Sequence, residues 1–209
     1  MELLDHFQSK HLTIEERIAS GKVLRKGIPR DMLGEYSPAP DRIDPVSILE
    51  EQAKTRLEEL VPVRYARMLT SPFAFLRGGA AIMAADLAAG VGSTGITVQA
   101  CGDMHLANFG VFASAERNLV FGINDFDETI PGPWEWDLKR LVASIVSAGR
   151  FLGATKTINK EGVLATVRSY REKMHEFAQM GYLDLWYATI SEKDVLKAVT
   201  GTAKQEHKK

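Results

Sequence analysis

The hydrophobic pattern of this chain changes its period once, in the middle, and no other feature constrains the fold as strongly. On both sides of the middle, apolar residues recur at helical spacing, for example in 45–60 and 163–177. In the middle, residues 96–101 are rich in β-formers, and 108–112 and 119–123 predict two further strands around a polar turn. The sequence therefore predicts an α+β, helix-rich fold with a small β-hairpin region.

Capping residues and helix breakers predict where the helices begin and end. Asp44 and Pro45 are typical of an N-cap and a first helical residue. Pro62 predicts the end of that helix, and Pro72 the end of the next. The expected helices are 45–60, 63–69, 80–89, 134–152, 163–177 and 183–199. The expected organisation is an N-terminal extension of short helices and loops (1–44), a main region (45–203) and a disordered tail (204–209).

Composition narrows the class of protein. The 209 residues, 45% hydrophobic and 25% charged, suit a globular domain with a sizeable core. A net charge of -1 and a pI of about 6.5 give no electrostatic footprint for nucleic acid. One cysteine, Cys101, excludes an internal disulfide and a cysteine-based zinc site. Without a signal-peptide pattern or a membrane-spanning apolar run, we expect a cytoplasmic protein with no membrane partner.

The densest polar cluster lies between residues 102 and 128, just past the predicted strands. A hairpin can return Asp125 to the neighbourhood of Asn108, and carboxylate and amide oxygens suit Mg²⁺, which bridges proteins to phosphates. Asp103 would then lie near the metal, where a carboxylate can accept a hydroxyl proton. The alternative is that these three residues only form turns and caps, which their side chains favour.

The spacing within this cluster resembles that of a known superfamily. Asp103 is followed five residues later by Asn108, as in the protein-kinase catalytic loop. The run Gly-Asp-Met-His-Leu-Ala-Asn at 102–108 more closely resembles the loop of aminoglycoside and choline phosphotransferases, and Asp-Phe-Asp at 125–127 resembles their metal motif. The resemblance implies a protein-kinase-like catalytic (C-terminal) lobe over 45–203. It also implies ATP and Mg²⁺ as cofactors, and phosphoryl transfer to a hydroxyl or amine of a small-molecule substrate.

The resemblance also implies a role for each residue of the motif. Asp103 is implied as the catalytic base, and His105 belongs to the same catalytic loop, where shaping the loop is favoured over direct chemistry. The implied metal ligands are Asn108, Asp125 and Asp127. Asp137 lies in a Trp-Asp-Leu segment that resembles the start of the superfamily's next helix. Its implied role is structural, bracing the backbone of the catalytic loop.

Several polar and aromatic residues outside this motif could have either a functional or a structural role. Arg77, beside two glycines, could bind a phosphate of the nucleotide cofactor bidentately, or could be a structural or surface arginine. Asp86, in an alanine-rich segment, predicts a structural ion pair, because buried carboxylates need partners. For Trp134 and Trp136, core packing is favoured over stacking on a substrate.

A longer set of segments resembles an uncharacterised bacterial family, domain of unknown function 2252. The segments are 75–78, 84–87, 101–110, 124–128 and 131–141. This family label implies no activity by itself. It implies a longer protein whose glycine-rich segment and lysine follow the catalytic motifs. We therefore expect this sequence to correspond to the N-terminal half, an incomplete kinase-like fold.

The sequence also departs from a complete kinase. No lysine lies between Lys54 and Lys139, so no phosphate-pairing lysine precedes the catalytic loop. The Gly-x-Gly-x-x-Gly pattern at 90–95 follows a helical stretch rather than a strand, which favours a linker loop over a nucleotide cradle.

These departures leave a non-catalytic alternative open. The chain would then be an inactive fragment, a pseudokinase or an interaction module. Exposed apolar surface would drive self-association or docking with a missing C-terminal half. A metal-dependent phosphoesterase is a further alternative, suggested by Asp103 and His105, but its other motifs are absent from the sequence.

Overall fold

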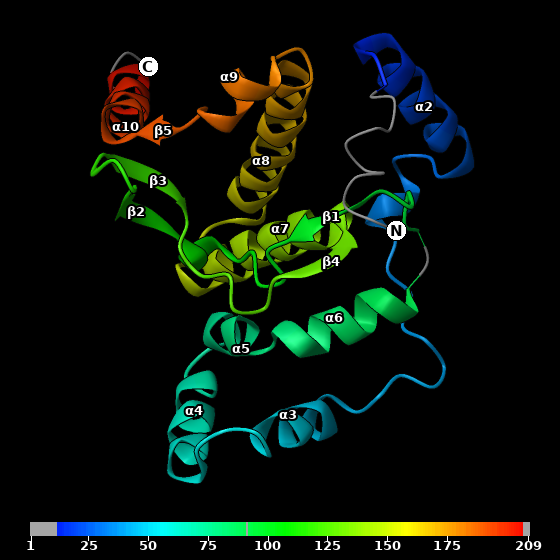
Figure 1. Cartoon of the computed structure of the whole chain (residues 1–209). Coiled ribbons are helices and arrows are strands. Elements are labelled where there is room, and N and C mark those ends of the chain that lie inside the picture. Colours follow the sequence, from blue (N-terminus) through cyan, green and yellow to red (C-terminus); the bar gives the residue numbers. More distant parts are fainter. Residues whose placement is uncertain (1–11, 91, 207–209) are drawn as a thin grey trace.

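One long helix, α7 (Trp134–Phe151), is the element around which the others are arranged (Figure 1). The computed structural model describes residues 12–90 and 92–206. In this part of the chain α7 contacts α5 (Pro72–Gly78), α6 (Ala80–Ala89), α8 (Lys156–Phe177) and β1 (Thr97–Ala100). The architecture is the predicted helix-rich α+β mixture with small sheets.

The N-terminal residues form a longer helix than the short turns that the sequence predicts. Helix α2 (Ile14–Gly27) is followed by the 3-10 turn η1 (Met32–Gly34). A capping box begins α2, because Thr13 Oγ1 accepts the Glu16 N–H at 3.2 Å and the Glu16 carboxylate accepts the Thr13 N–H at 2.8 Å. Acidic residues in its first turn and basic residues in its last also oppose the helix dipole.

Two prolines, which the sequence expects only to end the helices before them, lie in the first turns of helices. Helix α3 (Pro45–Ala53) starts at the predicted N-cap Asp44 but stops seven residues early, and η2 (Glu58–Leu60) leads into α4 (Val61–Met68). Pro62 lies in the first turn of α4, where a missing N–H breaks no helical hydrogen bond. Pro72 likewise opens α5, with Ser71 Oγ accepting the Ala74 N–H at 3.0 Å.

The sheets position the two polar segments of the sequence. Strands β2 (Phe109–Ala113) and β3 (Leu119–Ile123) form the predicted hairpin, with Phe109 opposite Ile123. Strand β1 pairs antiparallel with β4 (Ile130–Pro133), which the sequence does not predict because its prolines suggest a break. Both strands of a two-stranded sheet are edge strands, so prolines are tolerated there.

The last predicted helix, 183–199, is divided into three elements. They are α9 (Tyr182–Trp186), β5 (Ile190–Ser191), which pairs with β3, and α10 (Glu192–Glu206). Ser191 begins α10, because its Oγ accepts the Asp194 N–H at 3.3 Å and Asp194 Oδ2 accepts the Ser191 N–H at 3.1 Å. Of the predicted tail, residues 207–209 lie outside the described residues.

The buried apolar core is small for a chain of this length. Leu49, Met68 and Ile82 form one cluster between α3, α4 and α6. The accessible surface is 15789 Å², whereas a compact monomer of 23.1 kDa has about 9,700 Å². The arrangement in Figure 1 is therefore open. Many large apolar residues are exposed at the surface.

The length and hydropathy of the helices also bear on whether one of them could cross a membrane. No single helix in the described ranges is both long and apolar enough to cross a membrane. Helices α5 and α6 reach that length and hydropathy only when taken together, and they meet at a bend of 75°.

Candidate functional site

The loop between β1 and β2 carries three polar residues of the sequence motif into the interior. Asp103, His105 and Asn108 are only 9%, 6% and 7% exposed. The loop ends in the 3-10 turn η3 (Leu106–Asn108). Gly102 has a φ of +83°, and a Cβ there would overlap the Glu128 carbonyl oxygen, so only glycine fits. The motif therefore begins at a tight backbone approach between the loop and the segment after β3.

Helix α7 holds both ends of this loop. Asp137 Oδ2 accepts the Cys101 N–H at 2.7 Å, and its Oδ1 accepts the Gly102 N–H at 3.0 Å. Seven residues further along the helix, Ser144 Oγ accepts the Leu106 N–H at 2.8 Å. The backbone-bracing role predicted for Asp137 is confirmed by these bonds.

The Asn108 side chain joins the loop to the second polar segment. Its Nδ2 donates to the Asp103 carbonyl at 3.1 Å and to the Asp125 carbonyl at 3.3 Å. The Asn124 N–H donates to the Asn108 carbonyl at 2.9 Å. The predicted return of Asp125 to the neighbourhood of Asn108 is therefore confirmed, at the level of the backbone.

Asp103 forms a buried ion pair that the sequence does not predict. Arg140 Nε donates to Asp103 Oδ1 at 2.5 Å, and Arg140 Nη2 contacts the same oxygen. Arg140 is 3% exposed, and its Nη2 also donates to the Leu76 carbonyl at 2.8 Å. The only sequence signal is that Arg140 follows Asp137 by three residues and so lies on the same helix face.

His105 lies against this ion pair. Its Nε2 is 3.7 Å from Asp103 Oδ2, and its buried Nδ1 has no hydrogen-bond partner among the described residues. Burial lowers the pKa of His105, and the charges of Arg140 and Arg77 lower it further, while Asp103 opposes the shift. The imidazole is therefore neutral near pH 7.

The segment after β3 carries three carboxylates, Asp125, Asp127 and Glu128. Asp125 and Asp127 are exposed, and Asp125 Oδ1 accepts the Asp127 N–H at 3.2 Å. The pKa of Glu128 is raised by partial burial and then by the negative charges of Asp103, Asp125 and Asp127.

The available ligand atoms limit how the site could bind a metal ion. Within the described residues, no three His, Cys, Asp or Glu side chains gather so as to hold a metal ion by themselves. Mg²⁺ needs less, because it keeps several waters and commonly takes one or two carboxylates plus substrate phosphates. Asp125 and Asp127 fit that smaller requirement. For Asn108 only Oδ1 can be a ligand, since its Nδ2 donates to two carbonyls.

Two arginines also act electrostatically on residues of this site. Arg77 is exposed at the last turn of α5, next to Leu76, and its charge contributes to the lowered His105 pKa. Arg64, which the sequence does not single out, donates from Nη2 to the Gly78 carbonyl at 2.5 Å. Burial lowers the pKa of Arg64, while the charges of Glu128 and Asp103 oppose that shift.

Two other predicted residues have structural partners. The predicted ion pair of Asp86 is confirmed, because Arg42 Nε and Nη2 bind its two oxygens at 2.6 and 2.9 Å. Trp134 stacks on Tyr170 with ring centroids 5.8 Å apart. Trp136 instead lines a cavity, which is described below.

Fold and loop geometry together define a class: a helix-rich α+β protein with a buried polar loop braced by its central helix. Residues 56–209 match the family described as "Uncharacterized protein conserved in bacteria (DUF2252)", and the chain belongs to this family. The match confirms the resemblance to domain of unknown function 2252. Comparison with curated proteins finds no match, and comparison with solved structures finds none.

Proposed function

We propose that this protein is an ATP- and Mg²⁺-dependent phosphotransferase of the kinase-like type, acting on a hydroxyl or amine. The observation that carries the proposal is the position of Asn108, whose side chain ties the Asp103 loop to the segment that bears Asp125. A kinase-like enzyme must hold a metal-bound phosphate next to a catalytic base. An Asp-Asn loop joined to a following carboxylate in this way provides such an arrangement.

The distribution of charge around the loop supports the same proposal. Exposed Asp125 and Asp127 form an acidic side suited to Mg²⁺, and Arg64 and Arg77 lie where their charges act on the Asp103 loop. Arginines can bind phosphate bidentately, which would compensate for the absence of a lysine before the loop. Arg77 keeps its proposed role as a nucleotide-phosphate ligand.

Nucleotide binding tests this function directly. Titration of the protein with ATP should show binding that depends on Mg²⁺, and Asp125→Ala should weaken it at least about tenfold. Asp41→Ala, which removes another exposed carboxylate far along the chain, is the matched control and should bind as the unchanged protein does. Equal binding by both variants, or none by the unchanged protein, would contradict the proposal.

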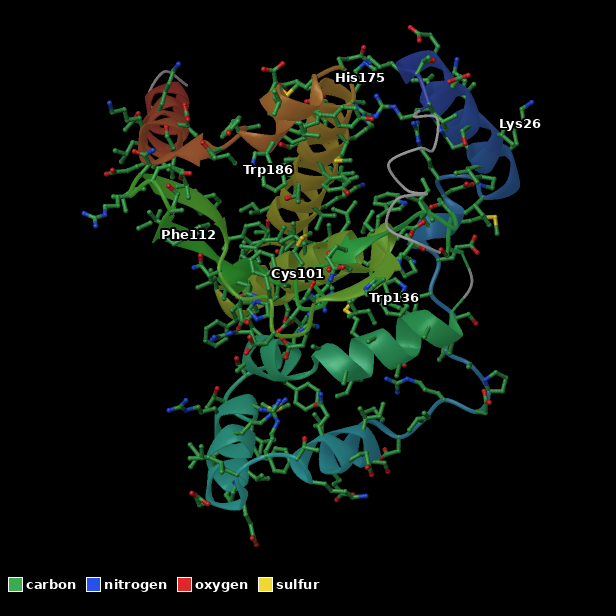
Figure 2. The ribbon with its side chains drawn as sticks, in the orientation of Figure 1. Lys26, Cys101, Phe112, Trp136, His175 and Trp186 are labelled. Carbon is green, nitrogen blue, oxygen red and sulfur yellow. The ribbon has the colours of Figure 1, made fainter. Side chains whose placement is uncertain are left out.

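A second candidate function is that of a pseudokinase or interaction module. Two observations favour it: the Asp103 carboxylate is engaged by buried Arg140, and large apolar side chains are exposed on α9. Figure 2 shows Trp186 projecting from this helix, and the residue is 81% exposed. The exposed residues of α9 and its C-cap include Tyr182, Leu183, Leu185, Trp186 and Tyr187.

Self-association distinguishes the second candidate from the first. If the exposed α9 side chains form an interface, the chain should be a dimer or larger by light scattering, and Trp186→Ser should make it monomeric. His175→Ser, at an exposed position of α8, is the control. A monomeric wild-type chain with low binding of a hydrophobic dye would argue for the catalytic proposal instead.

A further inference from the structure

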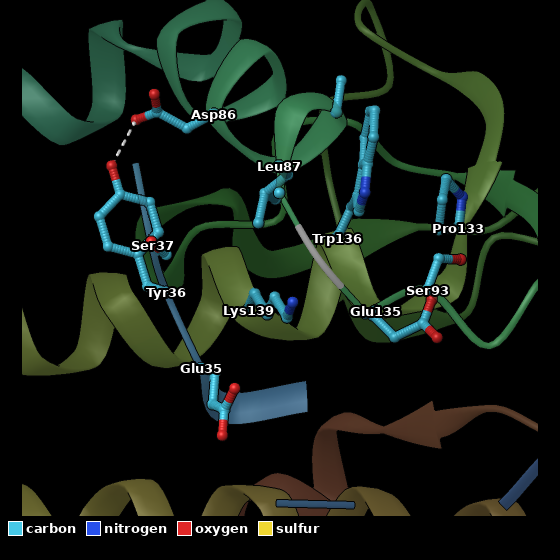
Figure 3. A pocket seen from close by; sticks show the side chains of 13 residues that line it. Glu35, Tyr36, Ser37, Asp86, Leu87, Ser93, Pro133, Glu135, Trp136 and Lys139 are labelled. Carbon is cyan, nitrogen blue, oxygen red and sulfur yellow. Dashed lines mark hydrogen bonds between the residues drawn. The ribbon is translucent and has the colours of Figure 1, made fainter. Parts of the chain in front are cut away.

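A cavity of about 130 Å³ lies on the face of α7 that does not hold the Asp103 loop (Figure 3). Its walls come from the segment before α3, the end of α6, the glycine-containing segment after α6 and the first turns of α7. The residues that matter for its chemistry are Tyr36, Leu87, Glu135, Trp136 and Lys139. None of them takes part in the loop contacts described above.

Glu135 provides a buried acceptor without a donor. The residue is 3% exposed, and its Oε1 accepts the Thr94 N–H at 2.7 Å. Its Oε2 is buried and has no hydrogen-bond partner among the described residues. A buried, unpaired carboxylate oxygen costs free energy unless a donor reaches it.

Lys139 provides a cation on the same wall. It follows Glu135 by four residues, one turn of α7, so the two side chains are neighbours on the helix surface. Both line the cavity, and in Figure 3 Lys139 lies between Tyr36 and Glu135. The ion pairs of the described residues do not include Lys139, with Glu135 or any other carboxylate. The cavity therefore presents an unpaired cation beside an unpaired acceptor.

The remaining wall is apolar and sets the size of the guest. Leu87 and the Trp136 ring face the cavity beside these polar groups. A cavity of about 150 Å³ accepts a guest the size of benzene, so this slightly smaller one suits a molecule of at most about six heavy atoms. Typical drug-sized pockets are larger, at about 300–1,000 Å³.

We propose that this cavity binds a small zwitterion of the free amino acid class. The ammonium group of the ligand donates to Glu135 Oε2, its carboxylate pairs with the Lys139 ammonium, and its apolar part packs on Trp136 and Leu87. A simple amine would leave Lys139 unpaired, and a simple carboxylate would leave Glu135 without a donor. This site is independent of the proposed phosphotransferase function.

Three matched probes test the proposal: L-alanine, ethylamine and propanoate. Ethylamine lacks the carboxylate of alanine, and propanoate lacks its ammonium group. Binding is followed by NMR at the indole N–H of Trp136, assigned with Trp136→Phe because the chain has three tryptophans. L-alanine should bind at least about tenfold more tightly than either partial probe.

Variants of the two charged residues complete the test. Glu135→Gln, which keeps an acceptor for Thr94, and Lys139→Met should each weaken L-alanine binding at least about tenfold. Lys156→Met, which removes an exposed lysine at the start of α8, should leave it unchanged. If Glu135→Gln does not fold, Lys139→Met decides, because Lys139 forms no ion pair within the described residues.

Three results would overturn the proposal. One is no response of Trp136 to L-alanine. Another is equal binding of the three probes, which would show that the two charged groups do not act together. The third is unchanged L-alanine binding in Lys139→Met.

Discussion

The two faces of α7 hold their polar residues in opposite ways. On the loop face, both oxygens of Asp137 accept backbone N–H groups, Arg140 binds Asp103, and Ser144 accepts from Leu106. On the cavity face, Glu135 has an oxygen without a partner and Lys139 has no ion pair among the described residues. The polar side chains of α7 itself thus have partners on the loop face and lack some of theirs on the cavity face, within three turns, and on the loop face His105 Nδ1 also has no partner in the described part of the chain.

This difference distinguishes residues that stabilise the fold from residues that could bind a ligand. A buried polar group whose bonds are complete contributes to stability, and removing it leaves its partner without a bond. A buried group with an unmade hydrogen bond costs the fold free energy, which a ligand that completes the bond can recover. Substitutions on the loop face should therefore change the free energy of unfolding, and those on the cavity face should change binding.

The largest expected effect is at Arg140. In Arg140→Met the Asp103 carboxylate stays buried without its cation, so the free energy of unfolding should fall by about 3–5 kcal/mol. Urea denaturation measures it. The neighbouring Lys139→Met, on the cavity face, is the control and should change stability by no more than about 0.5 kcal/mol. Equal costs at these two adjacent positions would remove the distinction between the faces.

Asp137 should give the next largest effect. Asp137→Asn keeps the size of the side chain but replaces one acceptor with an NH₂ group, which cannot accept from Cys101 or Gly102. The loss should be about 1.5–3 kcal/mol in the same denaturation experiment. Asp184→Asn, at an exposed position of α9, should have no measurable effect. A neutral Asp137→Asn would show that the brace contributes nothing to the fold.

The stability of the loop face should also depend on pH through His105. Because its pKa is lowered in the folded state, the unfolded chain binds the proton more readily below about pH 6.5. Stability should therefore fall as the pH drops through that value, by at most about 1.4 kcal/mol per pH unit from this group. Thermal unfolding at several pH values should show this decline.

Replacing each of two histidines isolates that contribution. His105→Gln should flatten the decline below pH 6.5, whereas His175→Gln, at an exposed site on α8, should retain it. The raised pKa of Glu128 acts in the opposite direction at lower pH, because its folded state holds the proton more tightly. An unchanged pH profile in His105→Gln would contradict the assignment.

The smallest effect on stability is expected on the cavity face. Glu135→Gln still offers an oxygen to the Thr94 N–H, so unfolding should change by less than about 1 kcal/mol. The same denaturation series measures it beside Asp137→Asn. A loss of stability as large as that of Asp137→Asn would show that Glu135 stabilises the fold. The contrast between the two faces of α7 would then rest on Lys139 alone.

The parts of the site that the sequence predicts are those with local signals. The hairpin follows from alternating β-formers around a polar turn, and the Asp137 brace follows from resemblance to a known motif. The Asp103–Arg140 pair has no such local signal, because its partners are far apart in the chain. They meet only because α7 packs with its Arg140 face toward the loop. The same is true of the cavity, whose walls come from four segments.

The fold predicted from the sequence is wrong where one residue type can have two structural roles. Proline both ends helices and opens them: α4 does end before Pro72 as predicted, but the sequence does not predict that Pro62 and Pro72 also lie in the first turns of helices. The segment 183–199 keeps an apolar pattern, but Ser191 and Asp194 interrupt it with a capping pair that starts a new helix. A Ser followed three residues later by an acidic residue is a recognisable cap, and this signal was present in the sequence.

Arg140 has a consequence for how the molecule opens. Its guanidinium joins three parts of the chain: the end of α5 through the Leu76 carbonyl, the Asp103 loop, and α7 itself. Separating any one of them exposes the same charge, so these segments should unfold as one cooperative unit. In hydrogen exchange, amides of α5 and of the Asp103 loop should share one opening free energy, although some 25 residues separate them in the sequence.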